Sequence, residues 1–344
     1  MLRHRWAAAV TATALCLLAA GAAGPAEAHD GRPDHHLGKG FTFAVIGDIP
    51  YGQAEIDHFP ANIRQINADR DVQWVSHLGD IKNGSSVCSD EYFDLIKSDV
   101  DVFEDPFVYT IGDNEWTDCH RPNNGGYNPL ERLDAVRDVF FPRPGYTLGK
   151  PTRVTSDAVA GYPENVRYVR DGVSFAAVHI VGSNNSLAPW TGNTTATPEQ
   201  TVEVLGRTAD AVSEIHAAFA KGHRRDNRAV VLMTQADMFD PTATDPKFGD
   251  YYAFQPIVAA IARESRAYGG PVYLFNGDSH LYNADRPLAP GSPWLDFYGL
   301  TSSSAPNLQR ITVDGSDNAN DYLKVTVTNN RREPLRWTRI AYTS

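Results

Sequence analysis

Four apolar segments of the chain share one pattern, because each is followed at once by a glycine and an aspartate. Apolar, β-branched and aromatic runs of this length predict buried strands. In open α/β sheets the ends of the strands face the ligand crevice, so the aspartates are predicted to gather at one edge of one sheet. The four segments are residues 41–46, 72–78, 107–111 and 272–276, which precede Asp48, Asp80, Asp113 and Asp278.

Helical spacing of apolar residues separates the first three strands, with Ser89 as a predicted capping residue. The β-α-β-α-β order favours parallel pairing. Residues 166–181 predict a hairpin around Asp171-Gly172. The helices are predicted over residues 56–68, 90–102, 129–140, 198–221 and 252–268, and further strands over residues 229–234, 311–313, 323–328 and 337–342. The last three strands are predicted to close a second sheet against the first.

The N-terminal 28 residues have the composition of an export signal. Arg3 and Arg5 precede an apolar stretch over residues 6–20, and Ala26-Glu27-Ala28 is a small-residue cleavage pattern. We expect a signal peptide over residues 1–28, a flexible leader over 29–40 and one domain over 41–344, in a secreted, extracellular protein. An uncleaved anchor is the alternative; after cleavage no membrane span is expected.

Export would leave Cys88 and Cys119 in an oxidising compartment, where a disulfide is the expected pairing and two free thiols are the alternative. The formal charge is −11, and removal of residues 1–28 makes it −12. This acidic balance, without a basic run, excludes an electrostatic footprint for nucleic acids or anionic membranes. Four carboxylates brought together would repel one another, so the pattern implies a cation among them.

Five short motifs carry a resemblance to a known family. They are G-D-I-P-Y, G-D-I-K-N-G, G-D-N-E, M-T-Q-A-D and G-D-S-H, in this order between residues 41 and 282. Together they resemble the calcineurin-like metallophosphoesterases, the superfamily that includes purple acid phosphatases. The resemblance implies an α/β fold of two facing mixed sheets with helices outside.

The resemblance also implies roles for residues. Asp48 and His280 would hold a first metal ion and Asp80 would bridge to a second, held by Asp113, Gln235 and Asp278. Asn114 stands where the family has a histidine that assists the leaving group. The departures are substantial: Pro50 replaces a histidine ligand, Gln235 offers an amide oxygen, and Asp113 and Asp278 add charge. These oxygen donors favour Mn²⁺, Mg²⁺ or Ca²⁺ over Zn²⁺, with iron also plausible, and one ion on Asp48, Asp80 and His280 is an alternative to two.

Other polar residues near the motifs are candidates for binding or proton transfer. Lys82, Asn83 and Asn184 are predicted to contact a phosphorylated small-molecule substrate, and a salt bridge from Lys82 to a neighbouring aspartate is the alternative. His120 is the histidine most available for proton transfer. His77 and His179, within apolar strands, are predicted to be buried and structural, and Asn114 and Glu115 to orient the ligands.

The sequence thus predicts a secreted, metal-dependent phosphoesterase. Because position 114 is not a histidine, we expect a preference for leaving groups that depart without a proton, unless His120 substitutes. A catalytically silent relative that binds a metal ion or an anion is the alternative, and a purely structural envelope protein is a third possibility. The sequence predicts no oligomeric state.

Overall fold

The computed structural model describes residues 40–343, so the predicted signal peptide and residues 29–39 of the predicted leader lie outside the described residues. The helices are α1 (Gly52–Ala68), α2 (Asp90–Val100), α3 (Pro129–Phe140), α4 (Gly182–Asn185), α5 (Pro198–Arg224), α6 (Gln255–Tyr268) and α7 (Pro293–Phe297). Short 3-10 turns lie at Thr117–His120, Pro122–Asn124, Ala158–Ala160, Phe248–Asp250, Tyr252–Phe254 and Ser316–Asn318.

The first sheet contains the strands that precede Asp48, Asp80 and Asp113. Its order is β13-β12-β1-β2-β3-β4, and β1, β2 and β3 are parallel neighbours while the other pairs are antiparallel. The strands are β1 (Thr42–Ile46), β2 (Val75–His77), β3 (Pro106–Tyr109), β4 (Leu148–Gly149), β12 (Asp321–Val327) and β13 (Leu335–Ala341).

The second sheet contains the strand that precedes Asp278. Its order is β10-β11-β9-β8-β7-β6-β5, with parallel pairing from β7 through β8 and β9 to β11. The predicted hairpin is confirmed: β6 and β7 pair antiparallel on either side of Asp171-Gly172. The strands are β5 (Thr155–Asp157), β6 (Tyr162–Arg170), β7 (Val173–Ala177), β8 (Ala229–Met233), β9 (Val272–Asn276), β10 (Asn283–Asp285) and β11 (Leu308–Thr312).

Two predictions about the sheets are wrong. The three C-terminal strands do not all join the second sheet, because only β11 pairs there, with β9 and β10, while β12 and β13 extend the first sheet beside β1. The aspartates also come from two sheets and not from one, since β1, β2 and β3 lie in the first and β9 in the second. The motif residues therefore meet where the ends of two facing sheets come together.

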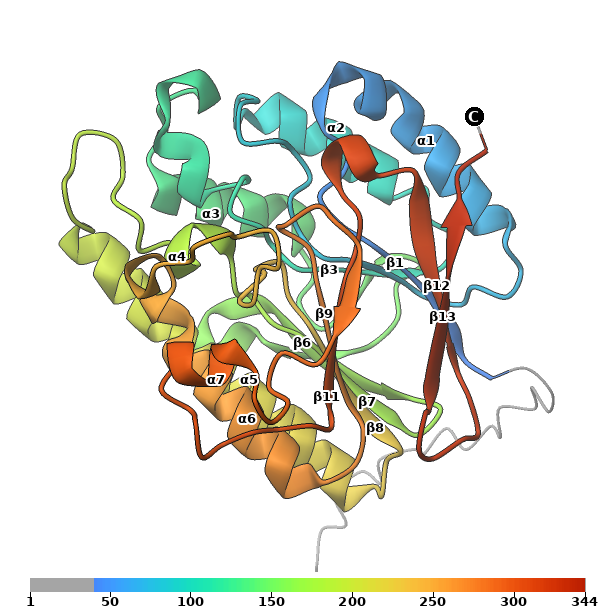
Figure 1. Ribbon diagram of the computed structural model, residues 1–344. Helices are drawn as coiled ribbons and strands as arrows, with labels where there is room; N and C mark the ends of the chain where they lie inside the picture. Colours follow the sequence, from blue (N-terminus) through green and yellow to red (C-terminus); the bar gives the residue numbers. More distant parts are fainter. Residues whose placement is uncertain (1–39, 344) are drawn as a thin grey trace, which may run out of the picture. The chain divides into compact units, whose positions relative to one another are not determined.

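Strand alternation divides the core into three layers. From β1, Phe43 and Val45 face the second sheet, where Phe43 packs edge-to-face on Phe175 with ring centroids 5.4 Å apart. Ala44 and Ile46 point the other way, into a cluster with α1, α2 and α3. A third cluster lies between the second sheet and helices α5 and α6. The helices therefore cover the outer faces of two facing sheets, as Figure 1 shows.

Most helix limits agree with the sequence pattern. Helix α3 has the predicted ends, and Ser89 caps α2 by accepting a hydrogen bond from the backbone of Tyr92. Helix α1 begins four residues earlier than expected, and α5 continues to Arg224. Helix α7 and strand β10 were not predicted. Between residues 40 and 343, no helix has both the length and the apolar character that a membrane span requires.

Candidate metal centre

The predicted ligands occupy sharp turns just beyond the strand ends. Asp48 follows β1, Asp80 follows β2, and Asp278 and His280 follow β9. All four have left-handed backbone conformations, with φ values of 52°, 56°, 73° and 57°. This conformation costs a non-glycine residue about 1–2 kcal/mol, and such residues cluster at functional sites. The strain marks this strand-end region as a candidate site before any chemistry is considered.

Glycines beside the aspartates allow the close approach of the loops. A Cβ atom at Gly112 would lie 2.0 Å from Oδ1 of Asp80, and one at Gly277 would lie 2.1 Å from Oδ2 of Asp48. Of the four glycines that precede the aspartates, only Gly79 has a left-handed backbone conformation, with φ of 94°. The repeated glycine-aspartate pattern therefore reflects close packing around carboxylates more than turn geometry.

A first group of ligand atoms belongs to Asp48, Asp80 and His280. One ligand atom from each lies within 4.8 Å of the others. The two carboxylates are buried, and Nε2 of His280 lies 3.4 Å from Oδ1 of Asp48, with 34% of the histidine side chain exposed. The structure thus brings together the three residues predicted to share one ion.

A second group of ligand atoms belongs to Asp80, Asp113 and Asp278, again within 4.8 Å of one another. Gln235 lies among them with its amide nitrogen toward the carboxylates, 3.2, 3.0 and 3.1 Å from their oxygens in that order. Its amide oxygen points away and accepts a hydrogen bond of 2.7 Å from the backbone N–H of Gly182. In this arrangement Gln235 is a donor to the carboxylates and does not present the ligand oxygen that was predicted.

Besides Gln235, two further neighbours hold Asp80. Asn114 donates its backbone N–H to Oδ1 over 3.1 Å and its side-chain amide to Oδ2 over 2.8 Å. Tyr51 donates its hydroxyl to the same Oδ2 over 3.0 Å. Asn114 therefore positions a predicted ligand, whereas Tyr51 was not predicted. The signal for Tyr51 was present in the G-D-I-P-Y motif, three residues after Asp48.

Burial and mutual repulsion disfavour full ionisation of this cluster. Burial raises the pKa of Asp48, and it raises those of Asp80 and Asp278 well above the ordinary carboxyl range, with the charge of Asp113 adding to both. Burial alone would lower the pKa of His280, but its hydrogen bond with Asp48 raises the pKa above its usual value.

The donor set of the first group fits a divalent cation. Between residues 40 and 343, no lysine or arginine makes an ion pair with Asp48, Asp80, Asp113 or Asp278, and His280 lies 3.4 Å from Asp48. Two carboxylates and an imidazole are ligands that Mn²⁺ or another divalent ion accepts. In the second group the amide of Gln235 already contacts all three carboxylates, so that pocket fits a second ion less well.

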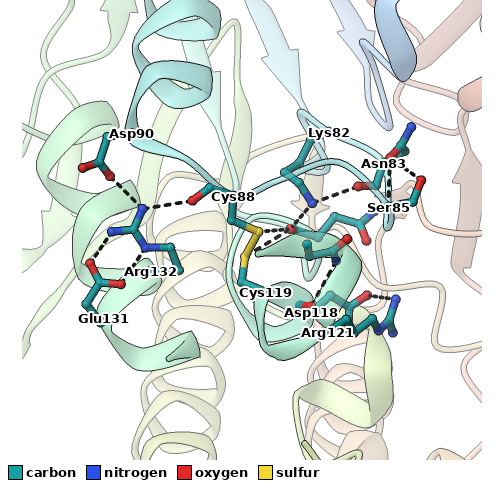
Figure 2. Close-up of a disulfide and its surroundings, with 12 residues drawn as sticks. Lys82, Asn83, Ser85, Cys88, Asp90, Asp118, Cys119, Arg121, Glu131 and Arg132 are labelled. Carbon is teal, nitrogen blue, oxygen red and sulfur yellow. Dashed lines mark hydrogen bonds and ion pairs between the residues drawn. A yellow bond between two sulfur atoms is a disulfide. The ribbon is translucent and has the colours of Figure 1, made fainter. Parts of the chain in front are cut away.

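Lys82 and Asn83 do not face the carboxylates as substrate contacts. Nζ of Lys82 is buried and donates 2.8 Å hydrogen bonds to the backbone carbonyls of Asn83 and Asn114. The side-chain oxygen of Asn83 accepts bonds from Ser85 and Ser86 in a local turn. Figure 2 shows Lys82 beside the disulfide, with its amine directed at these carbonyls. The contact with substrate predicted for these residues has no support in this geometry.

The structure contains the expected disulfide between Cys88 and Cys119. It joins the start of α2 to the 3-10 turn Thr117–His120, which follows the motif that contains Asp113 and Asn114. The bridge therefore ties together the loops after β2 and β3, which carry Asp80 and Asp113 (Figure 2).

The remaining candidates have mainly structural contacts. Nδ1 of His120 accepts a hydrogen bond from the backbone N–H of Thr191 and lies 2.8 Å from its hydroxyl oxygen. His120 lies outside both ligand groups. Asn184 bonds the backbone at Gly249 and Ala253. His77 and His179 are buried, as predicted. Glu115 accepts from the backbone of Ile81 and the hydroxyl of Tyr109, and its carboxyl group also hydrogen-bonds that of the predicted ligand Asp80.

A cavity of about 530 Å³ adjoins the carboxylates through Asp278 and Ser183. Ser183 donates its hydroxyl to Asp113 over 2.9 Å and lies 3.1 Å from Asp118. The wall also contains Asp240, Tyr251 and Tyr252, but no lysine or arginine. Ser183 and Asp118 were not predicted, and only their place near the G-D-N-E motif and a strand end could have suggested them.

No protein-family model matches this chain, and no curated protein matches it either. Among solved structures, a purple acid phosphatase from yellow lupin (Lupinus luteus) seeds aligns over 87% of this chain and 51% of its own, with 11% identity and a TM-score of 0.47. A 5'-nucleotidase precursor from Thermus thermophilus aligns over 88% of this chain and 54% of its own, with 10% identity and a TM-score of 0.45. GAP50, described as the anchor in the inner membrane complex of Plasmodium, aligns over 89% of this chain and 90% of its own, with 9% identity and a TM-score of 0.41.

This chain therefore spans about half the length of the phosphatase and of the nucleotidase. The two mixed sheets flanked by helices are the fold that the resemblance implied. The predicted fold class is therefore confirmed.

Proposed function

We propose that the protein is an exported, metal-dependent phosphoesterase that hydrolyses phosphate esters of small molecules. One observation carries the proposal: residues 48, 80 and 280, far apart in the chain, place ligand atoms within 4.8 Å of one another. Their backbone strain and the absence of lysine or arginine partners in the described chain support a cation site rather than a structural ion pair.

Asp48, Asp80 and His280 would hold one divalent ion. Such an ion supplies Lewis acidity, which polarises a phosphoryl oxygen and lowers the pKa of water. The chain's own contribution is positioning. Asn114 and Tyr51 fix the carboxylate of Asp80, and the backbone N–H of Asp278 fixes that of Asp48 over 3.0 Å.

We propose that the site holds a single ion. Gln235 directs an uncharged N–H donor at the three carboxylates that would hold a second ion. A neutral donor relieves part of their repulsion, and retained protons relieve more, as the raised pKa values of Asp80 and Asp278 indicate. The candidate ions are Mn²⁺, Mg²⁺ and Ca²⁺, with iron as a further candidate.

The cavity beside Asp278 would hold the organic part of the substrate. Its wall combines the aromatic rings of Tyr251 and Tyr252 with carboxylates such as Asp240, and contains no basic side chain. Such a wall repels further anionic groups and suits a neutral or cationic alcohol. We therefore propose simple monoesters or diesters as substrates, ahead of nucleoside di- or triphosphates.

The proposed location is outside the cell. The composition of residues 1–28 and the disulfide between Cys88 and Cys119 support export. The working unit would be the domain that begins at about residue 41, and its oligomeric state is not part of the proposal.

Calorimetric titration of chelator-treated protein with Mn²⁺, followed by assays on a panel of phosphate esters, tests the proposal. We expect binding of one ion and turnover only when metal is present. Asp48→Asn and His280→Gln should reduce turnover about 100-fold or more, because they remove ligands. Asp138→Asn, at an exposed position of α3, and His58→Gln, at an exposed position of α1, are the matched controls and should behave like the unmodified protein.

A second candidate is a catalytically silent metal-binding protein. The observation that favours it is the orientation of Gln235, together with Asn114 in place of a proton donor. Tight binding of one ion without turnover of any ester, with Mn²⁺, Mg²⁺, Ca²⁺ or iron added, would select this candidate. Absence of metal binding would exclude both.

A further inference from the structure

One groove of this acidic protein is lined mainly by positively charged side chains among its ionisable residues. It has a volume of about 800 Å³, and four of its wall residues are arginines while a single one is acidic, Glu333. The arginines are Arg286, Arg331, Arg332 and Arg336. The chain as a whole has a net charge of −11, so this grouping runs against its average composition.

Most of these guanidinium groups have no carboxylate partner. Within residues 40–343, only Arg331 makes an ion pair, a solvent-exposed one of 3.3 Å with Asp226. Arg286 donates to the backbone carbonyl of Pro306, and Arg332 and Arg336 are exposed. Buried arginines elsewhere behave differently, since Arg310 binds Asp237 at 2.5 Å. The groove therefore presents positive charge that the described chain does not neutralise.

Two aromatic side chains, Tyr273 and Trp337, line the groove together with the arginines. The rings of Tyr273 and Trp337 meet edge-to-face with centroids 6.5 Å apart. Nε1 of Trp337 donates to the hydroxyl of Tyr282 over 2.9 Å, which fixes the ring. A fixed aromatic surface beside guanidinium groups offers stacking as well as charge.

The groove lies at the opposite ends of the strands from the carboxylates. Val272, at the start of β9, lines the groove, whereas Asp278 follows the end of that strand. In the first sheet, Arg336 is in register through Thr326 with Thr42, at the start of β1. A five-residue strand spans roughly 17 Å, so this groove is separate from the candidate metal centre.

We propose that this groove is a second binding site, which takes a small anion with two or more oxyanion groups, such as a diphosphate or a polycarboxylate. Guanidinium groups bind such groups in a bidentate manner, and a groove of this volume suits a small molecule. The site does not depend on the proposed phosphoesterase activity, because none of its residues belongs to the metal centre.

A purely structural role for the arginines makes a different prediction. Gly269, the residue after α6, also lines the groove, so basic side chains there could act only on the negative end of the helix dipole. In that case Arg332→Ala and Arg336→Ala would lower the melting temperature without changing the affinity for any anion.

Calorimetric titration of chelator-treated protein with inorganic pyrophosphate tests the proposal, with citrate as the carboxylate probe. We expect binding that weakens about tenfold in Arg332→Ala and in Arg336→Ala, weakens less in Arg336→Lys, and declines as salt is added. The control Arg64→Ala, at an exposed position of α1, should bind like the unmodified protein. Binding of pyrophosphate alone would identify a phosphate site, and equal binding of citrate a general oxyanion site. No binding of either probe, or affinities unaffected by Arg332→Ala and Arg336→Ala, would overturn the proposal.

Discussion

Gln235 donates its side-chain amide to Asp113 over 3.0 Å, inside a pocket where two further carboxylates are within its reach. An amide nitrogen cannot bind a metal ion in this orientation, and rotation of the amide would leave the backbone N–H of Gly182 without its 2.7 Å acceptor. The hydrogen-bond network therefore determines which atom faces the pocket.

The first prediction is a change in metal stoichiometry at position 235. Gln235→Glu and Gln235→His each replace the donor by a ligand atom, so both should raise the number of bound Mn²⁺ ions from one to two. Calorimetry and metal analysis measure this number, and the spin coupling of two nearby Mn²⁺ ions provides a separate readout. Gln53→Glu, at an exposed position of α1, is the control and should leave the number at one. Two ions in the unmodified protein would contradict the prediction.

The second prediction concerns Tyr51, whose hydroxyl donates to Oδ2 of Asp80. Tyr51→Phe removes this bond but keeps the ring, which packs edge-to-face on His280. Loss of such an outer partner should weaken Mn²⁺ binding about tenfold. Tyr146→Phe, at an exposed position, should leave the affinity unchanged. Equal affinities of both variants would show that Asn114 and Gln235 hold Asp80 without Tyr51.

The third prediction concerns the leaving group. Asn114 cannot supply a proton efficiently, His120 lies outside the ligand groups, and burial raises the pKa of Tyr51 well above its usual value. Aryl phosphates, which depart as stable anions, should therefore be hydrolysed at least about 100-fold faster than alkyl phosphates. Comparison of kcat/KM for matched aryl and alkyl esters measures this ratio, and similar values would reveal a proton donor that the structure does not identify.

The positions of the strand ends follow from sequence periodicity, but the pairing of the strands does not. The apolar runs before Asp48, Asp80, Asp113 and Asp278 predicted buried strands with carboxylates at their ends, and local rules suffice for that. The pairing of strands does not follow from local rules, because β11 and β12 are separated by few residues yet join different sheets.

Side-chain orientation was still less predictable. Lys82 is two residues from Asp80, yet its amine turns to backbone carbonyls because a buried ammonium needs acceptors nearby. The orientation of Gln235 depends on Gly182, which is 53 residues away in the chain. The groove around Arg332 was missed because net charge averages over the whole sequence.

The fourth prediction is a pH dependence of the metal-free protein. The raised pKa values of Asp80, Asp278 and His280 mean that the folded state holds protons that the unfolded state has released. Stability therefore falls as pH rises above the unfolded pKa values, by about 1.4 kcal/mol per pH unit for each proton still held. Between pH 7 and 9 the melting temperature in a chelator should fall.

Divalent ions provide the control for this prediction. A bound cation takes the place of the retained protons, so Mn²⁺ should raise the melting temperature more at pH 9 than at pH 7. His77 and His179, whose pKa values burial lowers to about 4, act in the opposite sense and only as pH falls below 6.5, so they do not interfere in this range. An equal effect of Mn²⁺ at both pH values would count against a carboxylate-rich ion site.

The fifth prediction concerns the disulfide between Cys88 and Cys119, which are 31 residues apart in the chain. Loop-closure entropy for this separation amounts to about 3–4 kcal/mol, so the Cys88→Ala, Cys119→Ala double variant should lose about that much unfolding free energy in denaturant titrations. Both cysteines are buried in the cluster beneath α2 and α3, and cavity terms would add to this loss. Reduction of the unmodified protein separates the two contributions, because it opens the bridge without removing side-chain volume.

The bridge also joins the loops that carry Asp80 and Asp113, so reduction should weaken Mn²⁺ binding as well. Unchanged affinity after reduction would show that strand packing alone positions these carboxylates.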